Sequence, residues 1–148
     1  MKTYDSTLEI DAPAEQVWAV LTDFPAYGEW NTALPSLSGD LRVGSTLAMQ
    51  LNLGGRPMAV AADVQDLEPG RRFSWKGHLG TELLFTGERA FTVEPLGRER
   101  SRFRHVESIS GLLSGPFLLV KGKGVAEHHH GLNASVKQRA EQLASRAG

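Results

Sequence analysis

Polar and apolar residues alternate over the first ten positions of the chain, with Tyr4, Leu8 and Ile10 on one face. This period of two predicts a half-buried β-strand over residues 3–10. The spacing of apolar residues then changes to three and four, which predicts a helix ended by Pro25 and followed by a short helical turn. The chain therefore begins with one strand and two helical pieces.

Residues 36–110 read almost entirely as strand and turn. The pattern predicts a short strand near residues 37–42, then strands with short connections, of which the first is the Gly54–Gly55 turn. Short connections favour an antiparallel meander. Alternation gives these strands one broad apolar face, made of Leu47, Met49, Leu51, Met58, Val60, Phe73, Trp75, Leu79, Phe85, Phe91 and Phe103.

The C-terminal segment has the spacing of a long helix that covers this face. Its apolar stripe comprises Val125, His129, Leu132, Val136, Ala140 and Leu143. Gly122, Gly124 and Gly131 weaken its first half, so we expect a kink or break near residues 121–125. The predicted architecture is α+β, in a single domain over residues 1–148.

Composition narrows the function classes. The chain has 148 residues, with 16 basic and 17 acidic side chains and a net charge of -1, so it lacks the basic face that non-specific nucleic-acid binding needs. It has no cysteine, which excludes disulfides, thiolate metal sites and thiol nucleophiles. No apolar run is long enough for a membrane span, and the first residues lack the apolar stretch of a secretory signal, so we expect a cytoplasmic protein.

Three segments carry a resemblance to a known superfamily: Ile10–Trp18, Leu21–Asn31 and His105–Leu113. In these the chain resembles START domains, birch-pollen-allergen-like proteins and bacterial polyketide cyclase/dehydrase-like proteins, together called SRPBCC. The resemblance implies a helix-grip fold: a curved antiparallel sheet of about six or seven strands around a long C-terminal helix, with two short helices after the first strand. It also implies a cavity between sheet and helix, whereas the residue pattern alone fits a filled core equally well.

One charged cluster falls on the apolar face of the predicted sheet. Counting by two from Phe85 places Arg89 inward, and His105 and Glu107 share the inward face of the last strand. An inward guanidinium needs an anionic or carbonyl partner. The three residues form a structural salt bridge, bind a polar group of a ligand, or place a general acid–base His105 beside a substrate.

Two further groups invite functional interpretation. Consecutive helical residues point about 100° apart, so His128, His129 and His130 cannot converge on one ion, and we predict no metal site and no cofactor. His129 alone counts onto the core stripe, where it is a cavity-wall group or an ordinary histidine. The alternating arginines at 98, 100, 102 and 104 predict a solvated outer strand face, with an anionic partner or a dimer contact as alternatives.

Two apolar clusters lie near the expected ends of the cavity. Phe24, Tyr27 and Trp30 gate ligand entry or plug one end of the core. The other cluster seals the entrance or supports a dimer interface, and it comprises Leu112, Leu113, Phe117 and Leu118.

The favoured hypothesis is a monomeric or homodimeric protein that binds a small polyketide-like, lipid-like or aromatic ligand. The alternatives are a polyketide cyclase or aromatase that uses Arg89, His105 or Glu107, and an interaction module with a vestigial cavity. The predicted ligand-binding residues are Trp30, Met49, Leu51, Val60, Phe73, Trp75, Phe85, Arg89, Phe91, Phe103, His105, Glu107, Val125, His129 and Leu132.

Overall fold

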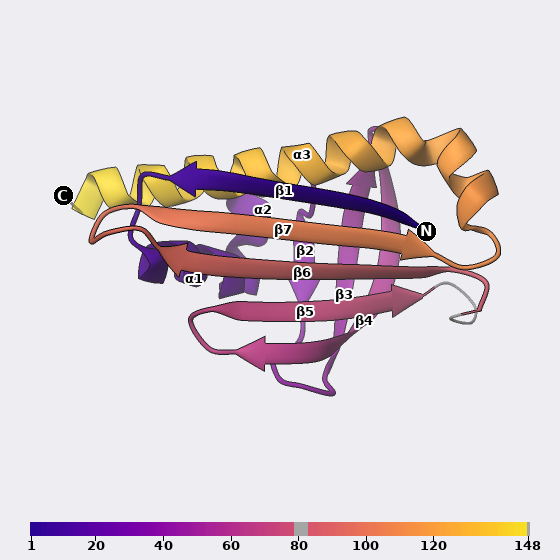
Figure 1. Cartoon of the computed structure of the whole chain (residues 1–148), viewed down its shortest axis with the longest axis horizontal. Coiled ribbons are helices and arrows are strands. Elements are labelled where there is room, and N and C mark those ends of the chain that lie inside the picture. Colours follow the sequence, from indigo (N-terminus) through magenta and orange to yellow (C-terminus); the bar gives the residue numbers. More distant parts are fainter. Residues whose placement is uncertain (79–82, 148) are drawn as a thin grey trace.

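The computed structural model describes residues 1–78 and 83–147, so the predicted inward position of Leu79 lies outside the described residues. The first half of the chain forms β1 (Lys2–Ile10), α1 (Ala14–Thr22), the short helix η1 (Phe24–Ala26), α2 (Tyr27–Trp30), β2 (Ser36–Ser38) and β3 (Thr46–Leu53). The second half forms β4 (Arg56–Glu68), β5 (Arg72–His78), β6 (Thr86–Pro95), β7 (Ser101–Ser110) and α3 (Ser114–Ala147) (Figure 1).

All seven strands belong to one antiparallel sheet in the order β1-β7-β6-β5-β4-β3-β2. β3 to β7 form the predicted meander, and β1 pairs with β7. β4 is long, and its register to β5 shifts between Val64 and Asp66, an irregularity of the kind that bends strands and increases twist. Figure 1 shows β3 and the first part of β4 running steeply across the direction of β5, β6 and β7, whereas the end of β4 bends to run beside β5, which curves the sheet.

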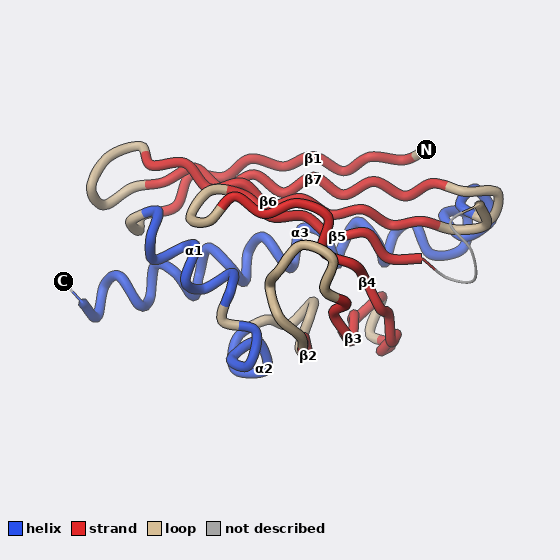
Figure 2. Tube along the Cα trace, turned by 90° about the horizontal axis from the view of Figure 1, so that it is seen from below, coloured by secondary structure: helices blue, strands red, loops and turns tan. Residues whose placement is uncertain are grey.

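α3 packs on the concave face of this sheet, on the same side as α1 (Figure 2). The predicted stripe is confirmed where Val125, Leu132, Val136 and Ala140 are buried. Of the kink or break expected near residues 121–125, there is no break, since the helix is continuous there, and Figure 1 shows its first turns bent relative to the rest. The architecture is the helix-grip α+β fold that the sequence predicted.

The core lies between the sheet and the helices. Phe91 packs at its centre, with ring centroids 5.1 Å from Phe73 and 6.0 Å from Phe103. Burial of aromatic side chains of this size contributes strongly to stability. Other fully buried members include Ile10, Val17, Leu21, Leu34, Leu47 and Leu132.

Four predicted element boundaries differ from the structure. The strand expected at 37–42 spans only Ser36–Ser38, because Gly39 adopts a φ of 125° that extended strand does not allow. α1 already ends at Thr22, and Pro25 lies in η1 instead of ending a helix. Phe85 precedes β6, because the carbonyls of Leu83 and Leu84 accept hydrogen bonds from the turn after β7.

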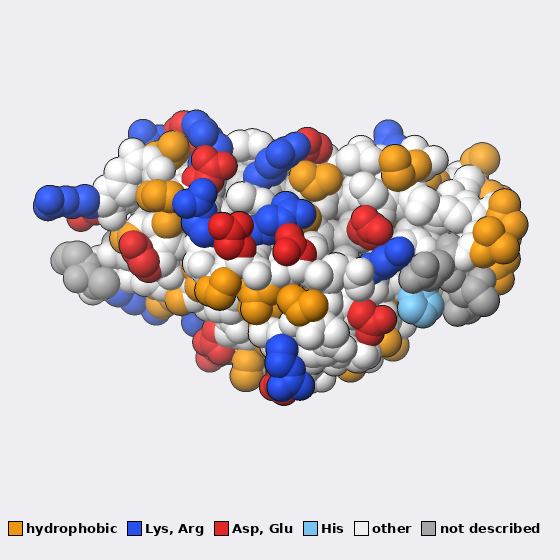
Figure 3. Space-filling view, turned by 60° about the horizontal axis from the view of Figure 1, so that its bottom comes forward, with side chains coloured by type: hydrophobic (Ala, Val, Ile, Leu, Met, Phe, Trp, Pro, Cys, Tyr) orange, Lys and Arg blue, Asp and Glu red, His pale blue; other side chains and the backbone are white. Residues whose placement is uncertain are grey.

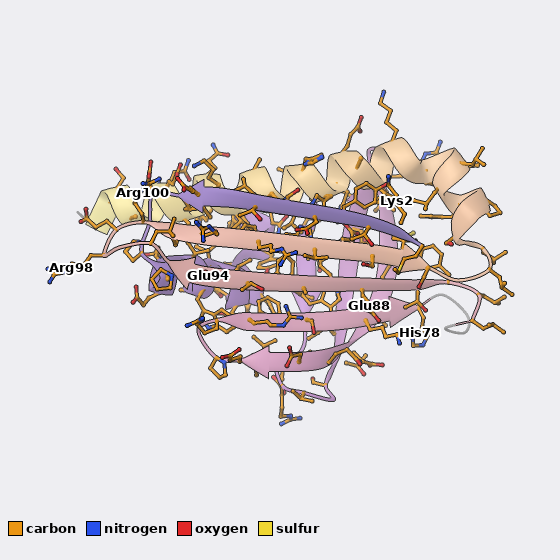
Figure 4. All side chains as sticks on the ribbon, in the orientation of Figure 1. Lys2, His78, Glu88, Glu94, Arg98 and Arg100 are labelled. Carbon is orange, nitrogen blue, oxygen red and sulfur yellow. The ribbon has the colours of Figure 1, made fainter. Side chains whose placement is uncertain are left out.

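The fourth boundary concerns the arginines, because Arg98 and Arg100 lie in the turn before β7 and only two of the four are in the strand. Figure 4 shows Arg98 projecting from that end of the molecule. Ion pairs join Arg100 to Glu9 and Asp11, Arg102 to Glu94, and Arg104 to Asp5. Figure 3 shows basic and acidic side chains interspersed on the face in view, which fits a solvated, internally paired surface.

Within the described ranges, no helix combines the length and the apolar character that crossing a membrane requires.

Candidate functional site

A small cavity lies between α3 and the bent part of the sheet. Its volume is about 70 Å³, below the roughly 300–1,000 Å³ of typical ligand pockets. Its wall is mainly apolar and includes Met49 and Met58, whose flexible side chains adapt readily to a guest. The lining residues are Met49, Leu51, Leu53, Met58, Val60, Ala62, Trp75, Gly77, His78, Phe85, Gly87, Glu88, Arg89, Glu107, Ile109, Phe117, Val125 and His128.

Arg89 and Glu107 form the buried polar end of this cavity. They sit directly opposite each other on β6 and β7, and both lie on the inward face that the alternation of those strands predicted. Arg89 Nη2 donates to Glu107 Oε2 across 2.9 Å, and the two residues are only 5% and 8% exposed. The guanidinium also lies 6.0 Å from the centre of the Trp75 ring. A buried pair of this kind is strongly destabilised when one partner is removed.

His128 is the second partner of Arg89, and the sequence analysis was wrong to leave it off the core stripe. Its Nε2 accepts from Arg89 Nη2 at 2.9 Å, and its Nδ1 donates to the carbonyl of Asn52 at 3.1 Å. Only a neutral imidazole can accept and donate in this way. Burial and the adjacent guanidinium accordingly lower the pKa of His128 to about 4.

His129 approaches Glu107 from the other side. Its Nδ1 lies 3.2 Å from Glu107 Oε1 and its Nε2 lies 2.9 Å from the hydroxyl of Ser6. Burial alone raises the pKa of Glu107, but Arg89 and the hydrogen bond from His129 outweigh it and hold that pKa well below its ordinary value. Glu107 is therefore an ionised carboxylate with both oxygens engaged.

His105 is fully buried and does not line the cavity. Its Nδ1 bonds Asn133 Oδ1 at 2.9 Å, and its ring stacks on those of Phe91 and His129. Burial and the nearby Arg89 charge lower its pKa well below the ordinary histidine value. The predicted trio therefore separates: Arg89 and Glu107 meet at the cavity, and His105 lies in the core behind them.

The donor atoms of His105, Glu107 and His129 lie within 4.8 Å of one another, which raises the question of a metal ion. The two imidazoles stack with centroids 4.2 Å apart and planes 17° apart. Lone pairs in nearly parallel planes do not converge on one ion, and the Arg89 charge beside Glu107 repels a cation. This arrangement does not fit a metal centre.

The predicted ligand-binding residues divide into two groups in the structure. Those that line the cavity are Met49, Leu51, Val60, Trp75, Phe85, Arg89, Glu107 and Val125. Those that do not line it are Trp30, Phe73, Phe91, Phe103, His105, His129 and Leu132. All but Trp30 of the second group are buried in the core, and Trp30 packs on Tyr27 with ring centroids 5.0 Å apart.

Sequence reasoning missed one close contact beside the cavity. Gly54, in the β3–β4 turn, has a φ of 58° and lies against Gly124 of α3. A Cβ on Gly124 would stand 3.3 Å from the Gly54 nitrogen, so the helix and the hairpin approach as closely as glycines allow. The chain neighbours of these two glycines, Leu53 and Val125, line the cavity, so this contact lies at its edge. The sequence signal for this contact was the presence of two glycines in the turn, Gly54 and Gly55, and of two more in the helix, Gly122 and Gly124, that was predicted to pack on the sheet.

An exposed apolar cluster occupies the end of the molecule at which α3 begins. Its members are Leu83, Leu84, Leu112, Leu113, Leu119 and Val120. Figure 3 shows hydrophobic side chains gathered at one end of the molecule, and Figure 4 places His78, which lines the cavity, near that end. Phe117 and Phe85, whose ring centroids are 4.8 Å apart, connect this cluster to the cavity wall.

Comparisons with known proteins agree with this architecture. A START superfamily protein from Mycobacterium smegmatis matches with a TM-score of 0.73 and 22% identity, over 95% of this chain and 98% of that one. The di-domain ARO/CYC BexL of the BE-7585A biosynthetic pathway matches with a TM-score of 0.74 and 16% identity, over 95% of this chain and 47% of that one.

Norcoclaurine synthase from Thalictrum flavum, in complex with dopamine and hydroxybenzaldehyde, matches with a TM-score of 0.71 and 16% identity, over 99% of this chain and 88% of that one. At these identities the likeness concerns the fold. A search of curated proteins finds no match to the chain. The family model described as "Polyketide cyclase / dehydrase and lipid transport" matches residues 1–148, and the chain belongs to that family.

Proposed function

We propose that the protein binds a small, mainly apolar ligand in the cavity between α3 and the sheet. The observation that carries this proposal is the apolar wall that ends in the buried Arg89–Glu107–His128 group. Ligand sites commonly combine an apolar lining with a few fixed polar groups. The family description and the fold support the same proposal.

The size of the cavity sets a condition on the ligand. A volume of about 70 Å³ does not enclose a ring system, so a larger ligand widens the space or extends through the mouth. Leu51, Met58 and Val60 are half-buried at the wall formed by β3 and β4. Because these side chains lie at the edge of the core and not in its centre, this wall is the expected route of widening.

The electrostatics favour binding over acid–base catalysis. A general base works best with a pKa near the operating pH. Glu107 is held ionised by Arg89, the pKa of His128 is about 4, and His105 does not line the cavity. The groups at the buried polar end of the cavity are therefore suited to fixing a ligand's orientation.

A cavity-filling variant tests the proposal with N-phenyl-1-naphthylamine, a neutral probe that fluoresces in apolar sites. Val60→Phe adds bulk inside the cavity, and Ala59→Phe adds the same side chain on the exposed opposite face of β4. We expect Val60→Phe to weaken probe binding about tenfold or more, since each ~1.4 kcal/mol is tenfold, and Ala59→Phe to leave it unchanged. Equal affinities in the two variants, or no binding to the wild type, would refute cavity binding.

A further inference from the structure

We propose that the ligand carries a neutral oxygen acceptor, such as a ketone, ester or amide carbonyl, that hydrogen-bonds to Arg89. This inference rests on the proposed function and names the chemistry of the ligand's polar end. The proposed function would hold for a purely apolar ligand, whereas this inference would be wrong if the ligand had no oxygen acceptor.

The first observation is an unused donor. Arg89 Nη2 already serves both Glu107 and His128, whereas Nη1, which is buried, has no hydrogen-bond partner in the described structure. A buried amino group without a partner is costly, because its lost hydration is not replaced. Arg89 lines the cavity, so a guest that reaches the polar end comes to the residue that carries this unused donor.

The second observation is that the obvious acceptors are occupied. Glu107 receives Arg89 on Oε2 and His129 on Oε1, and the His128 Nε2 lone pair is taken by Arg89. Because the Asn52 carbonyl oxygen fixes the His128 ring from its other nitrogen, the imidazole does not turn away freely. The group is therefore held in one arrangement with a donor left over, and an acceptor from the ligand completes it.

The third observation decides between a neutral acceptor and a carboxylate. Among the described residues, Arg89 and Glu107 are the only buried members of the Lys, Arg, Asp and Glu types, and their formal charges cancel. A ligand carboxylate adds an uncompensated negative charge beside Glu107 in an apolar space, which is expensive. A neutral carbonyl accepts the hydrogen bond and leaves the charge balance unchanged.

The test uses three ligands of matched chain length: octane, 2-octanone and octanoate. Each competes at pH 7 against N-phenyl-1-naphthylamine, on the wild type and on the double variant Arg89→Met/Glu107→Gln, which removes the donor and both charges together. The matched control is Arg104→Met/Asp5→Asn, which removes an exposed ion pair on the outer face of the sheet in the same way. The quantity compared between proteins is the ratio of two ligand affinities measured on the same protein. Differences in ligand solubility affect this ratio equally in every protein and therefore cancel.

We expect the affinity of 2-octanone relative to octane to fall roughly tenfold in Arg89→Met/Glu107→Gln, as for loss of a hydrogen bond to a charged group. The control variant keeps the wild-type ratio. In the wild type, octanoate binds at least about tenfold more weakly than 2-octanone. An unchanged ratio in the double variant, or octanoate binding as tightly as the ketone, overturns the inference.

A measurement on the wild type alone guards against a variant that fails to fold. The infrared carbonyl stretch of bound 2-octanone should lie below its position in hexane, because a hydrogen bond from Arg89 weakens the C=O bond. A carbonyl frequency like that in hexane overturns the inference. If octane and 2-octanone still displace the probe in that case, the proposed function stands. If the protein binds neither the probe nor any of the three ligands, both proposals fall.

Discussion

The Arg89–Glu107 pair shows that one charged residue on the apolar face of each of two strands is enough to place a polar group in the interior. Each strand alternates, so a charged residue at an inward position has no route to water. The pair is tolerable because the partners stand opposite each other at 2.9 Å, because His129 bonds the second oxygen of Glu107, and because His128 accepts a further hydrogen bond from Arg89 Nη2. Arg89 Nη1 is the one amino group of this guanidinium left without a partner among the described residues.

Replacing Glu107 by Gln tests the cost of this arrangement. Glu107→Gln leaves the buried Arg89 charge uncompensated, and we expect a loss of about 3–5 kcal/mol in the free energy of unfolding. Urea denaturation measures this loss. The exposed pair offers a control, because Asp5→Asn removes an ion pair that water already screens and should leave the midpoint nearly unchanged. Equal effects of the two substitutions would show that the Arg89–Glu107 pair is not buried as described.

The buried histidines make stability depend on pH. The folded pKa of His128 is about 4, and that of His105 is also lowered, whereas unfolded histidines titrate near 6.5. Between these values the unfolded chain binds protons that the folded chain does not, so protonation favours unfolding. The free energy of unfolding should therefore fall as pH is lowered from about 6.5 towards 4, by up to ~1.4 kcal/mol per pH unit for each proton.

Glu107 extends the same trend to lower pH, since a carboxyl with a lowered folded pKa loses its stabilising effect as pH falls below its unfolded value. His128→Gln keeps an acceptor for Arg89 and removes one titrating group. Its stability curve, measured by urea unfolding at successive pH values, should be shallower between pH 6.5 and 4. A curve parallel to that of the wild type would contradict the assigned state of His128.

Sequence reasoning located part of this group for a definable reason. Period-two counting is reliable along regular strands, so it places Arg89 and Glu107 on the inward face, where they are found. It did not find His128, because a helix held inside a curved sheet is buried over a wider arc than a single stripe of apolar residues suggests. Counting also did not show that His105 lies outside the cavity. His105 and Glu107 both point inward from the same strand, and only the packing around them decides which side chain reaches the cavity.

At the scale of elements, α3 makes a close contact with the β3–β4 hairpin beside the cavity. Gly122 and Gly124 are neighbours on one helix but meet different surroundings. A Cβ on Gly122 meets no described atom within 4 Å, whereas one on Gly124 meets the Gly54 backbone at 3.3 Å. Gly122 therefore only lowers the helix propensity of this segment, as the sequence predicted. Gly124 does so too, but it also allows the helix to approach the hairpin closely.

This difference gives a matched pair of variants. Gly122→Ala should raise the free energy of unfolding by about 1 kcal/mol through helix propensity alone. Gly124→Ala should gain clearly less or lose stability, because the hairpin must move to admit the methyl group. Thermal or urea denaturation of both variants measures the difference, and identical gains would show that the helix and hairpin are not in contact at this point.

Element order and topology followed from the sequence better than element ends did. The strand, short helices, meander and closing helix all appear in the predicted order, because alternation and helical spacing persist along whole elements. The ends depended on single backbone positions, such as the φ of Gly39 that stops β2 and the hydrogen bonds of Leu83 and Leu84 that delay β6.

At the scale of the whole molecule, one sheet and one long helix enclose a small space with a polar end and an adjacent apolar rim. The outer face of the sheet is covered by paired charges, whereas exposed large apolar side chains gather where α3 begins. This polarity of the molecule is consistent with the proposed ligand entering at the apolar end where α3 begins and reaching Arg89 at the polar end.

The most direct test of the central claim uses the three methionine methyl groups as reporters. Met49 and Met58 line the cavity, and Met1, which is 92% exposed, is an internal control. In a protein labelled with ¹³C at the methionine methyls, titration with 2-octanone should shift the NMR signals of Met49 and Met58 in a saturable way and leave Met1 in place. Unmoved Met49 and Met58 signals at ligand excess, or equal shifts at all three, would contradict binding in this cavity.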